Sequence, residues 1–295
     1  MGRRKVRKQA LKRAIFFYAW NAFVITALVV LACGKQTVLQ NQPDPQISTK
    51  PLTLGVFSSV STPVTDSPLT QLSDTLAALS PAEREELDVR LYVSGADSQA
   101  AADAYLQTAG LNIPAVVDTG EFKKYVGQGS FPSVVLLERS GAALSSPLGA
   151  LDDWSLAVGE AAQILRNRIT VILFGAPWCS ECKQDLPAIE QEIAKRSPRQ
   201  RAGLRTMLYV TTATSPAAAP TEAVALEYRN ALRLDATAFA DPWRWKNFKK
   251  YVGGDLVLPG AAVLDPSGNI LHSYRAGATN FVPAEIIDFA VRSIP

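Results

Sequence analysis

The chain has few of the residues that build metal sites and disulfide scaffolds. Its 295 residues include three Cys, one His and two Met. A single His excludes zinc sites that need several histidines. Three Cys are too few for a fold that several disulfides hold together. The remaining composition, 47% apolar and 19% charged, is that of an ordinary globular protein of about two domains.

Acidic residues are missing from the N-terminal region, where the first is Asp44. Seven of the 30 basic residues lie in residues 1–13, so 23 bases face 27 acids in the rest of the chain. The positive charge therefore belongs to the N-terminus. The mildly acidic remainder lacks the basic surface of a nucleic-acid-binding protein, and we expect no nucleic-acid partner.

An apolar run over 14–32 follows the basic residues and ends at Cys33. This order predicts a signal peptide or membrane anchor over 1–32. A polar linker with three prolines follows over 33–51. The tract VLAC at 30–33 resembles a bacterial lipobox, which implies lipidation of Cys33; an uncleaved signal anchor is the alternative. Both predictions tether the remainder to the membrane outside the cytoplasm, in a bacterial envelope or periplasm.

A repeated hexapeptide divides the rest of the chain. FKKYVG occurs at 122–127 and again at 248–253. Each copy is followed by a proline (Pro132 or Pro259), an apolar run, a Ser-Gly pair and a second run, which predicts a hairpin. We infer an internal repeat.

The segments before each hexapeptide also match. Apolar runs at 52–57 and 169–174 each precede a helical pattern, and further predicted strands lie at 88–94 and 205–211. The order strand, helix, strand, helix, strand, strand, helix occurs twice, which predicts an α/β fold with helices covering a central sheet. We expect domains over 52–167 and 168–295; one large α/β domain is the alternative.

Two cysteines mark a candidate redox site. The strand at 169–174 leads into a loop, and Cys179 falls where a helix is expected to begin, with Cys182 one turn later. A helix N-terminus favours a thiolate, and such a pair can cycle between dithiol and disulfide. A structural disulfide or part of a metal site are the alternatives. We expect no metal, because His272 is the only His; it is interpreted as a surface or packing residue, with a catalytic role as the alternative.

The motif WCxxCxxDxP (Trp178, Cys179, Cys182, Asp185, Pro187) resembles the thioredoxin superfamily, in particular its extracytoplasmic TlpA/ResA-like proteins. The resemblance implies two tandem thioredoxin-like folds, each with a central mixed sheet flanked by helices. It also implies that Pro259 is the cis-proline shaping the substrate groove and that Trp178 shields the site.

This sequence departs from the family at two positions. Leu173 stands where a buried acid often relays a proton, and Gly175 stands where an aromatic residue is common. Glu181 or water are then the alternatives for the proton route. The first half has no Cys in its loop at 58–68. It therefore resembles a thioredoxin-like domain without CxxC, for docking, dimerisation, substrate presentation or simple support.

We therefore predict a membrane-tethered, extracytoplasmic protein-disulfide oxidoreductase. Cys179 attacks a client disulfide and Cys182 resolves the mixed disulfide, without another cofactor. The resemblance favours a reductase of envelope client proteins, recharged by a membrane electron donor. A disulfide-forming oxidase or isomerase is one alternative. A non-catalytic docking or assembly lipoprotein is the other.

Overall fold

The computed structural model describes residues 50–62, 68–150, 152–241, 245–276 and 281–295. The predicted signal or anchor segment, most of the linker and Cys33 lie outside the described residues. Within the described part, no helix combines the length and apolar character needed to cross a membrane.

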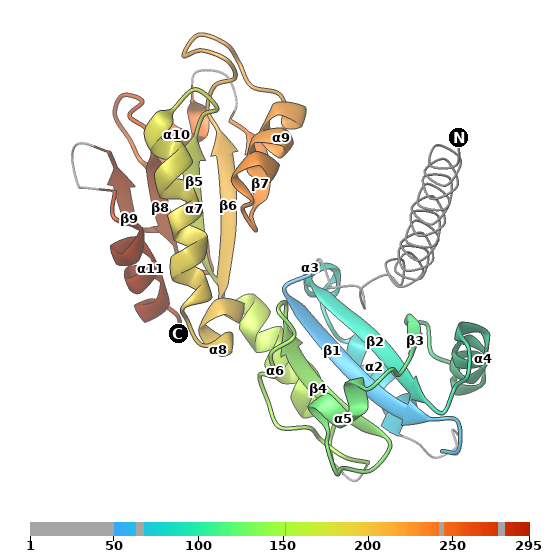
Figure 1. Cartoon of the computed structure of the whole chain (residues 1–295). Helices are drawn as coiled ribbons and strands as arrows, with labels where there is room; N and C mark the ends of the chain where they lie inside the picture. The colour runs from blue at the N-terminus through green and yellow to red at the C-terminus, as the bar shows by residue number, and fades with distance from the viewer. Residues whose placement is uncertain (1–49, 63–67, 151, 242–244, 277–280) are drawn as a thin grey trace, which may run out of the picture. The chain divides into compact units, whose positions relative to one another are not determined.

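The first repeat contains four strands and five helices among the described residues (Figure 1). In chain order they are β1 (Leu52–Ser59), α2 (Pro68–Ala77), α3 (Pro81–Glu86), β2 (Leu87–Ser94), α4 (Gln99–Ala109), β3 (Ala115–Val117), α5 (Glu121–Tyr125), β4 (Ser133–Glu138) and α6 (Ser155–Arg166).

The second repeat follows the same order and adds one strand. Its elements are β5 (Ile169–Gly175), α7 (Ser180–Ala194), α8 (Pro198–Ala202), β6 (Leu204–Val210), α9 (Glu222–Leu232), β7 (Thr237–Ala240), α10 (Lys246–Tyr251), β8 (Gly260–Leu264), β9 (Ile270–Arg275) and α11 (Pro283–Arg292).

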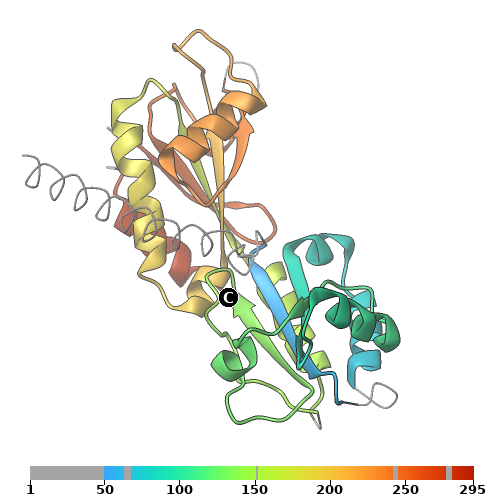
Figure 2. The same ribbon diagram turned by 45° about the vertical axis from the view of Figure 1, so that its right-hand side comes forward.

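Each repeat forms its own mixed sheet. The strand orders are β3-β2-β1-β4 and β7-β6-β5-β8-β9. The central strands β1 and β5 pair in parallel with β2 and β6 and antiparallel with β4 and β8. In both repeats a helix packs beside the parallel edge strand, α4 against β3 and α9 against β7 (Figures 1 and 2). The predicted fold class, two tandem thioredoxin-like folds, is confirmed.

The hexapeptide repeat has a structural reason. Its first residue, Phe122 in α5 or Phe248 in α10, packs against the central strand of its sheet. Phe122 meets Phe57 edge-on with ring centroids 6.0 Å apart, and Phe248 meets Phe174 at 5.3 Å. A tyrosine of the neighbouring strand stacks on each central phenylalanine. The same aromatic cluster therefore fills one face of both sheets.

The other face of each sheet carries the larger apolar core. In the second repeat, α7, α9 and α11 bury residues such as Leu186, Ala225 and Ile286 against Leu173 and Val171 of β5. Since β5 is buried on both faces, its sequence ITVILFG is almost continuously apolar. The strand is thereby packed on both faces up to the point where it leads into the CxxC loop.

The first predicted hairpin is only partly formed, which corrects the sequence prediction. After the turn at Ser140-Gly141, the chain makes only two isolated bridges to β4, Leu137 with Ala143 and Val134 with Leu148. Pro147 lies between them and has no N–H to donate, so a regular ladder is interrupted there. The second hairpin has no such proline and forms β8 and β9 in full.

Candidate functional site

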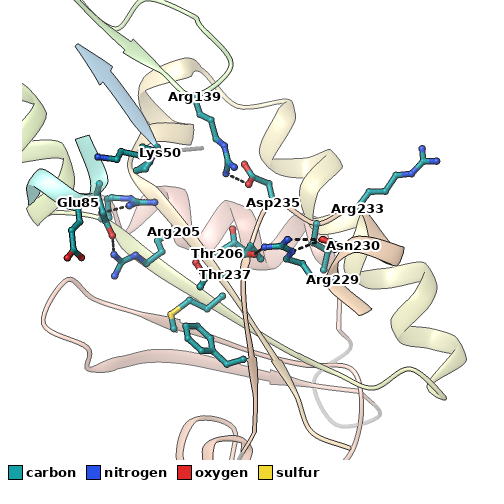
Figure 3. A pocket seen from close by; sticks show the side chains of 17 residues that line it. Lys50, Glu85, Arg139, Arg205, Thr206, Arg229, Asn230, Arg233, Asp235 and Thr237 are labelled. Atoms are coloured by element: carbon teal, nitrogen blue, oxygen red, sulfur yellow. Dashed lines mark hydrogen bonds and ion pairs between the residues drawn. The ribbon is translucent and has the colours of Figure 1, made fainter. Parts of the chain in front are cut away.

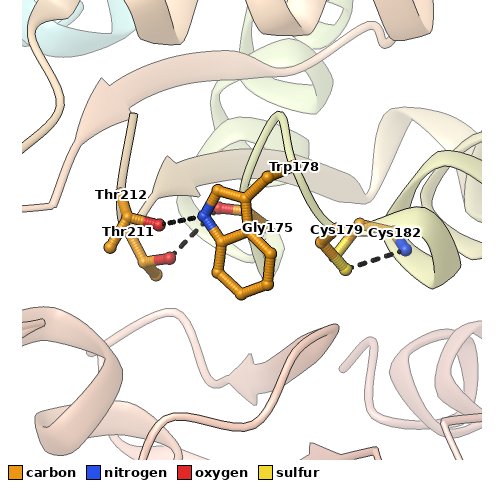
Figure 4. The surroundings of a disulfide bond; sticks show 6 residues. All are labelled: Gly175, Trp178, Cys179, Cys182, Thr211 and Thr212. Atoms are coloured by element: carbon orange, nitrogen blue, oxygen red, sulfur yellow. Dashed lines mark hydrogen bonds between the residues drawn. A yellow bond between two sulfur atoms is a disulfide. The ribbon is translucent and has the colours of Figure 1, made fainter. Parts of the chain in front are cut away.

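Cys179 and Cys182 form a disulfide at the start of α7 (Figure 4). Their Cα atoms are 5.3 Å apart. Cys179 is the residue that caps the helix, and its sulfur accepts a hydrogen bond from the backbone N–H of Cys182 at 3.1 Å. The predicted placement, a strand followed by a short loop and then a helix start, brings the two cysteines together.

This geometry suits thiol–disulfide exchange. The N–H of Cys182 and the positive end of the helix dipole both stabilise negative charge on the Cys179 sulfur. Cys182 is fully buried, whereas Cys179 is 3% exposed. Both cysteines are thus buried, and Cys179, at the N-terminus of α7, is slightly the more exposed of the two.

The exposed Trp178, directly before Cys179, is held in place by a hydrogen bond. Its indole N–H donates to Thr212 Oγ1 at 2.7 Å, while 41% of the residue remains exposed (Figure 4). Thr211 also holds the loop, because its backbone N–H and its hydroxyl both donate to the carbonyl of Gly175. The two buried threonines follow β6, next to β5 in the sheet, and fix the entry to the CxxC loop.

Thr211 and Thr212 were not predicted from the sequence. A signal was present, because Thr211 ends and Thr212 follows the strand predicted over 205–211, which should end at the same sheet edge as the strand before Cys179. Parallel neighbours such as β5 and β6 end side by side, so polar residues directly after one can contact the loop after the other.

Pro259 lies beside the CxxC loop through the strand register. Phe174 pairs with Gly260 in the antiparallel ladder of β5 and β8, so Pro259 comes next to Gly175 at the end of β5. The peptide bond before Pro259 is cis, as is the bond before Pro132 in the first repeat. The two prolines predicted to be equivalent occupy equivalent positions.

Carboxylates stand along the first turns of α7. Glu181 is exposed in the first turn. Partial burial, assisted by the negative charge of Glu181, raises the pKa of Asp185 above its ordinary value. Leu173, one of the two positions at which the sequence departs from the motif it resembles, is completely enclosed by the apolar core. The two carboxylates therefore lie outside the core on α7, and Leu173 belongs to the same apolar core as the two cysteines.

A hollow adjoins the CxxC loop. It has a volume of about 590 Å³, and its lining includes Pro177 and Lys183 from the two sides of the cysteine pair together with Val224, Tyr228 and Leu232 of α9. Its lining is mainly apolar, with Lys183 and Glu227 as charged members. It is the right kind of surface for an apolar side chain of a bound polypeptide.

A second, larger hollow lies away from the cysteines (Figure 3). It has a volume of about 880 Å³ and is lined by charged residues of both repeats. Arg168 and Arg205 both pair with Glu86, and Arg139 pairs with Asp235. These arginines therefore form ion pairs with acids of the same compact unit. The lining of this hollow includes neither cysteine, so the hollow is not part of the redox site.

His272 is remote from the cysteines. It lies exposed on β9 in register with Val263, and its ring contacts those of Tyr274 and Phe289. This agrees with the predicted role of a surface or packing residue.

The fold and the site together define a chain of two thioredoxin-like folds, of which the second carries a CxxC disulfide. No protein-family model and no curated protein matches the sequence. Solved structures similar to it include the pneumococcal exposed lipoprotein thioredoxin Etrx1 from Streptococcus pneumoniae, with 18% identity over 43% of this chain and 86% of that chain (TM-score 0.33).

Two other solved structures are similar at the same level. StoA from Bacillus subtilis has 16% identity over 39% of this chain and 84% of its own (TM-score 0.31). A secreted Mycobacterium tuberculosis disulfide oxidoreductase has 17% identity over 38% of this chain and 81% of its own (TM-score 0.29). At these identities, function follows from the geometry of the site rather than from the similar proteins.

Proposed function

We propose that this chain is a thiol–disulfide oxidoreductase that acts on protein clients. The observation that carries the proposal is the Cys179–Cys182 disulfide, with Cys179 capping a helix and accepting the N–H of Cys182. A purely structural disulfide would close a loop too short to stabilise the fold much. The redox group is the cysteine pair itself, and the reaction needs no other cofactor.

The reaction proceeds through a mixed disulfide. In the reduced protein, the Cys179 thiolate attacks one sulfur of a client disulfide, and the client's other sulfur leaves as a thiolate that takes a proton from solvent. The Cys182 thiolate then attacks the Cys179 sulfur. The Cys179–Cys182 bond forms, the bond to the client breaks, and the second client sulfur leaves and is protonated. Two electrons pass from the cysteine pair to the client.

We infer that the client lies over Trp178 and Pro259 with a side chain in the apolar hollow beside Pro177. The exposure of Trp178, its anchor on Thr212 and the position of Pro259 next to Gly175 support this arrangement. The first repeat keeps the same fold without cysteines, and we assign it to docking of clients or partners.

We favour the reductase direction. The exposed carboxylate of Glu181 stands between the two cysteines in sequence and disfavours a thiolate on Cys179, which makes the pair less oxidising. The basic and apolar N-terminus and Cys33 lead us to place the protein in the bacterial envelope, tethered to the membrane and recharged by a membrane electron donor.

The test is capture of the mixed disulfide. The full chain carrying Cys182→Ser cannot resolve the intermediate, so incubation with insulin as a disulfide client should give a covalent adduct that dithiothreitol releases. Cys179→Ser and the double variant are the matched controls and should give none when Cys33, the third cysteine of the chain, is replaced by Ser in every variant. Equal results for all three variants would contradict the oxidoreductase function and support a docking protein built on thioredoxin-like folds.

A further inference from the structure

Tyr228 carries a buried hydroxyl without a hydrogen-bond partner among the described residues. It lies on α9, and only 5% of the residue is exposed. A buried hydroxyl that makes no hydrogen bond loses its interaction with water and gains nothing in return. Such a group is uncommon in a folded protein and calls for a reason.

The hydroxyl lies next to the strand end that leads into the CxxC loop. A Cβ atom placed on Gly175 would be 3.4 Å from the Tyr228 hydroxyl and 2.7 Å from Leu186 Cδ1. Gly175 precedes Cys179 by four residues, and Leu186 follows Cys182 by one helical turn on the same face of α7. The hydroxyl therefore lies beside the strand end that leads into the CxxC loop, in the same apolar core as Cys182 and Leu186.

The first repeat shows what this position contains when no redox site is present. Tyr105 is the seventh residue of α4, as Tyr228 is the seventh of α9. The Tyr105 hydroxyl forms a 2.6 Å hydrogen bond with Ser58 Oγ. Ser58 follows Phe57 just as Gly175 follows Phe174. Each of these phenylalanines pairs with a tyrosine of the neighbouring parallel strand, so Ser58 and Gly175 occupy equivalent positions. The repeat that carries the cysteines thus keeps the tyrosine and has glycine in place of its serine partner.

We propose that the Tyr228 hydroxyl, unpartnered while the disulfide is closed, donates a hydrogen bond to the Cys182 sulfur when the disulfide opens, directly or through one water molecule. This inference rests on the proposed redox function and deepens it. It supplies the polar group that the apolar Leu173 does not.

Tyr228 suits a donor rather than a base. Burial raises the pKa of its phenol well above the ordinary value, so the hydroxyl keeps its proton throughout the reaction. In the resolving step, the Cys182 thiolate attacks Cys179 and the client sulfur leaves. A hydrogen bond from Tyr228 keeps Cys182 ionised and oriented before that attack, and no proton passes to or from Tyr228.

Two effects of the hydrogen bond act in the same direction. The hydrogen bond stabilises the reduced cysteine pair. In the disulfide form the hydrogen bond is absent, and the unsatisfied Tyr228 hydroxyl destabilises that form. Tyr228→Phe removes both effects and should make the pair more reducing. We expect the equilibrium with glutathione to shift about tenfold toward the disulfide, which corresponds to a potential about 30 mV lower. The Cys182 thiol should ionise at higher pH, and resolution of a mixed disulfide should slow about tenfold at neutral pH.

The experiment compares the full chain with three variants in glutathione redox buffers. Tyr105→Phe is the matched control, because it removes the equivalent hydroxyl from the repeat without cysteines, and it should keep the wild-type equilibrium. Gly175→Ser restores the partner found in the first repeat and should behave like Tyr228→Phe. A Cβ atom at this position would lie 2.7 Å from Leu186 Cδ1, the movable end of a side chain, and 3.3 Å from Tyr228 Cε1, so both side chains must shift slightly to admit the serine.

The outcomes separate this inference from the proposed function. A wild-type pair that never exchanges with glutathione would overturn both. A wild-type pair that cycles, with Tyr228→Phe within twofold of it in equilibrium and resolution rate, would overturn the role of Tyr228 alone. An equal shift in Tyr105→Phe would also overturn it, because the effect would then be a general loss of stability.

Discussion

Glu190 should make the stability of the protein depend on pH. This glutamate lies on α7, two turns after Cys182, and its Oε1 accepts the backbone N–H of Asp235 at 3.0 Å. Burial raises its pKa to about 7, and the positive charge of Arg139 opposes the rise only in part. Arg139 itself pairs with Asp235. The ionised form of Glu190 is therefore disfavoured in the folded protein although a cation is close.

The direction of the effect follows from the raised pKa. At pH well below 4.5 the carboxyl is protonated in both the folded and the unfolded chain, so it costs nothing. Above pH 4.5 the carboxyl releases its proton more readily in the unfolded chain than in the folded one. The free energy of unfolding therefore falls until the pH passes 7. Each pKa unit corresponds to about 1.4 kcal/mol, so the full loss is about 3 kcal/mol and about 2.5 kcal/mol falls between pH 5 and pH 8.

The assay is urea unfolding of the full chain at pH 5 and pH 8. Glu190→Gln keeps the shape of the protonated side chain and should remove about 2.5 kcal/mol of the wild-type difference between the two pH values. Glu227→Gln, an exposed glutamate on α9, is the matched control and should keep the wild-type difference. Parallel pH profiles for wild type and Glu190→Gln would refute the reasoning about Glu190.

Two further predictions concern how the second sheet is held. Phe248 is fully buried against Phe174, so Phe248→Ala should lower the free energy of unfolding by about 3–5 kcal/mol. Phe122→Ala, at the half-buried equivalent position of the first repeat, should lower it by less. Equal losses of the two variants in urea unfolding would contradict this prediction. The buried Asp241 accepts the backbone N–H groups of Asn247 and Phe248 at 2.8 and 3.0 Å. Asp241→Ala should therefore cost about 1–3 kcal/mol and Asp241→Asn less, and an unchanged unfolding midpoint in the Ala variant would rule this out.

The sequence predicted most of the fold because the fold is repeated. The hexapeptide FKKYVG marks equivalent helices, and its phenylalanine fills the same aromatic cluster twice. The apolar runs gave the central strands, because a strand buried on both faces has almost no polar residues. The short helices α3 and α8 were not predicted. Each begins with a capping box, at Ser80 and at Ser197, and is too short for its apolar pattern to be recognised.

The site was predicted only in part. Cys179, Cys182 and Pro259 could be placed from spacing and resemblance, because strand, loop and helix follow one another along the chain. Thr212 was not predicted, although its place directly after a strand expected to neighbour the one before Cys179 was a signal for it. Tyr228 could not be predicted, because it approaches Gly175 from a helix distant in sequence through packing in the core. Aligning the two repeats would have singled out Gly175 as the counterpart of Ser58, but only the structure shows that Ser58 pairs with Tyr105.

The attack of Cys179 on a client disulfide is tested most directly by the mass of the intact Cys182→Ser chain after exposure to insulin. The predicted result is a species heavier by one insulin molecule, linked through Cys179 and released by dithiothreitol. The absence of that species, under conditions where the same chain is folded and its Cys179 thiol reacts with a small alkylating reagent, would contradict the proposed function.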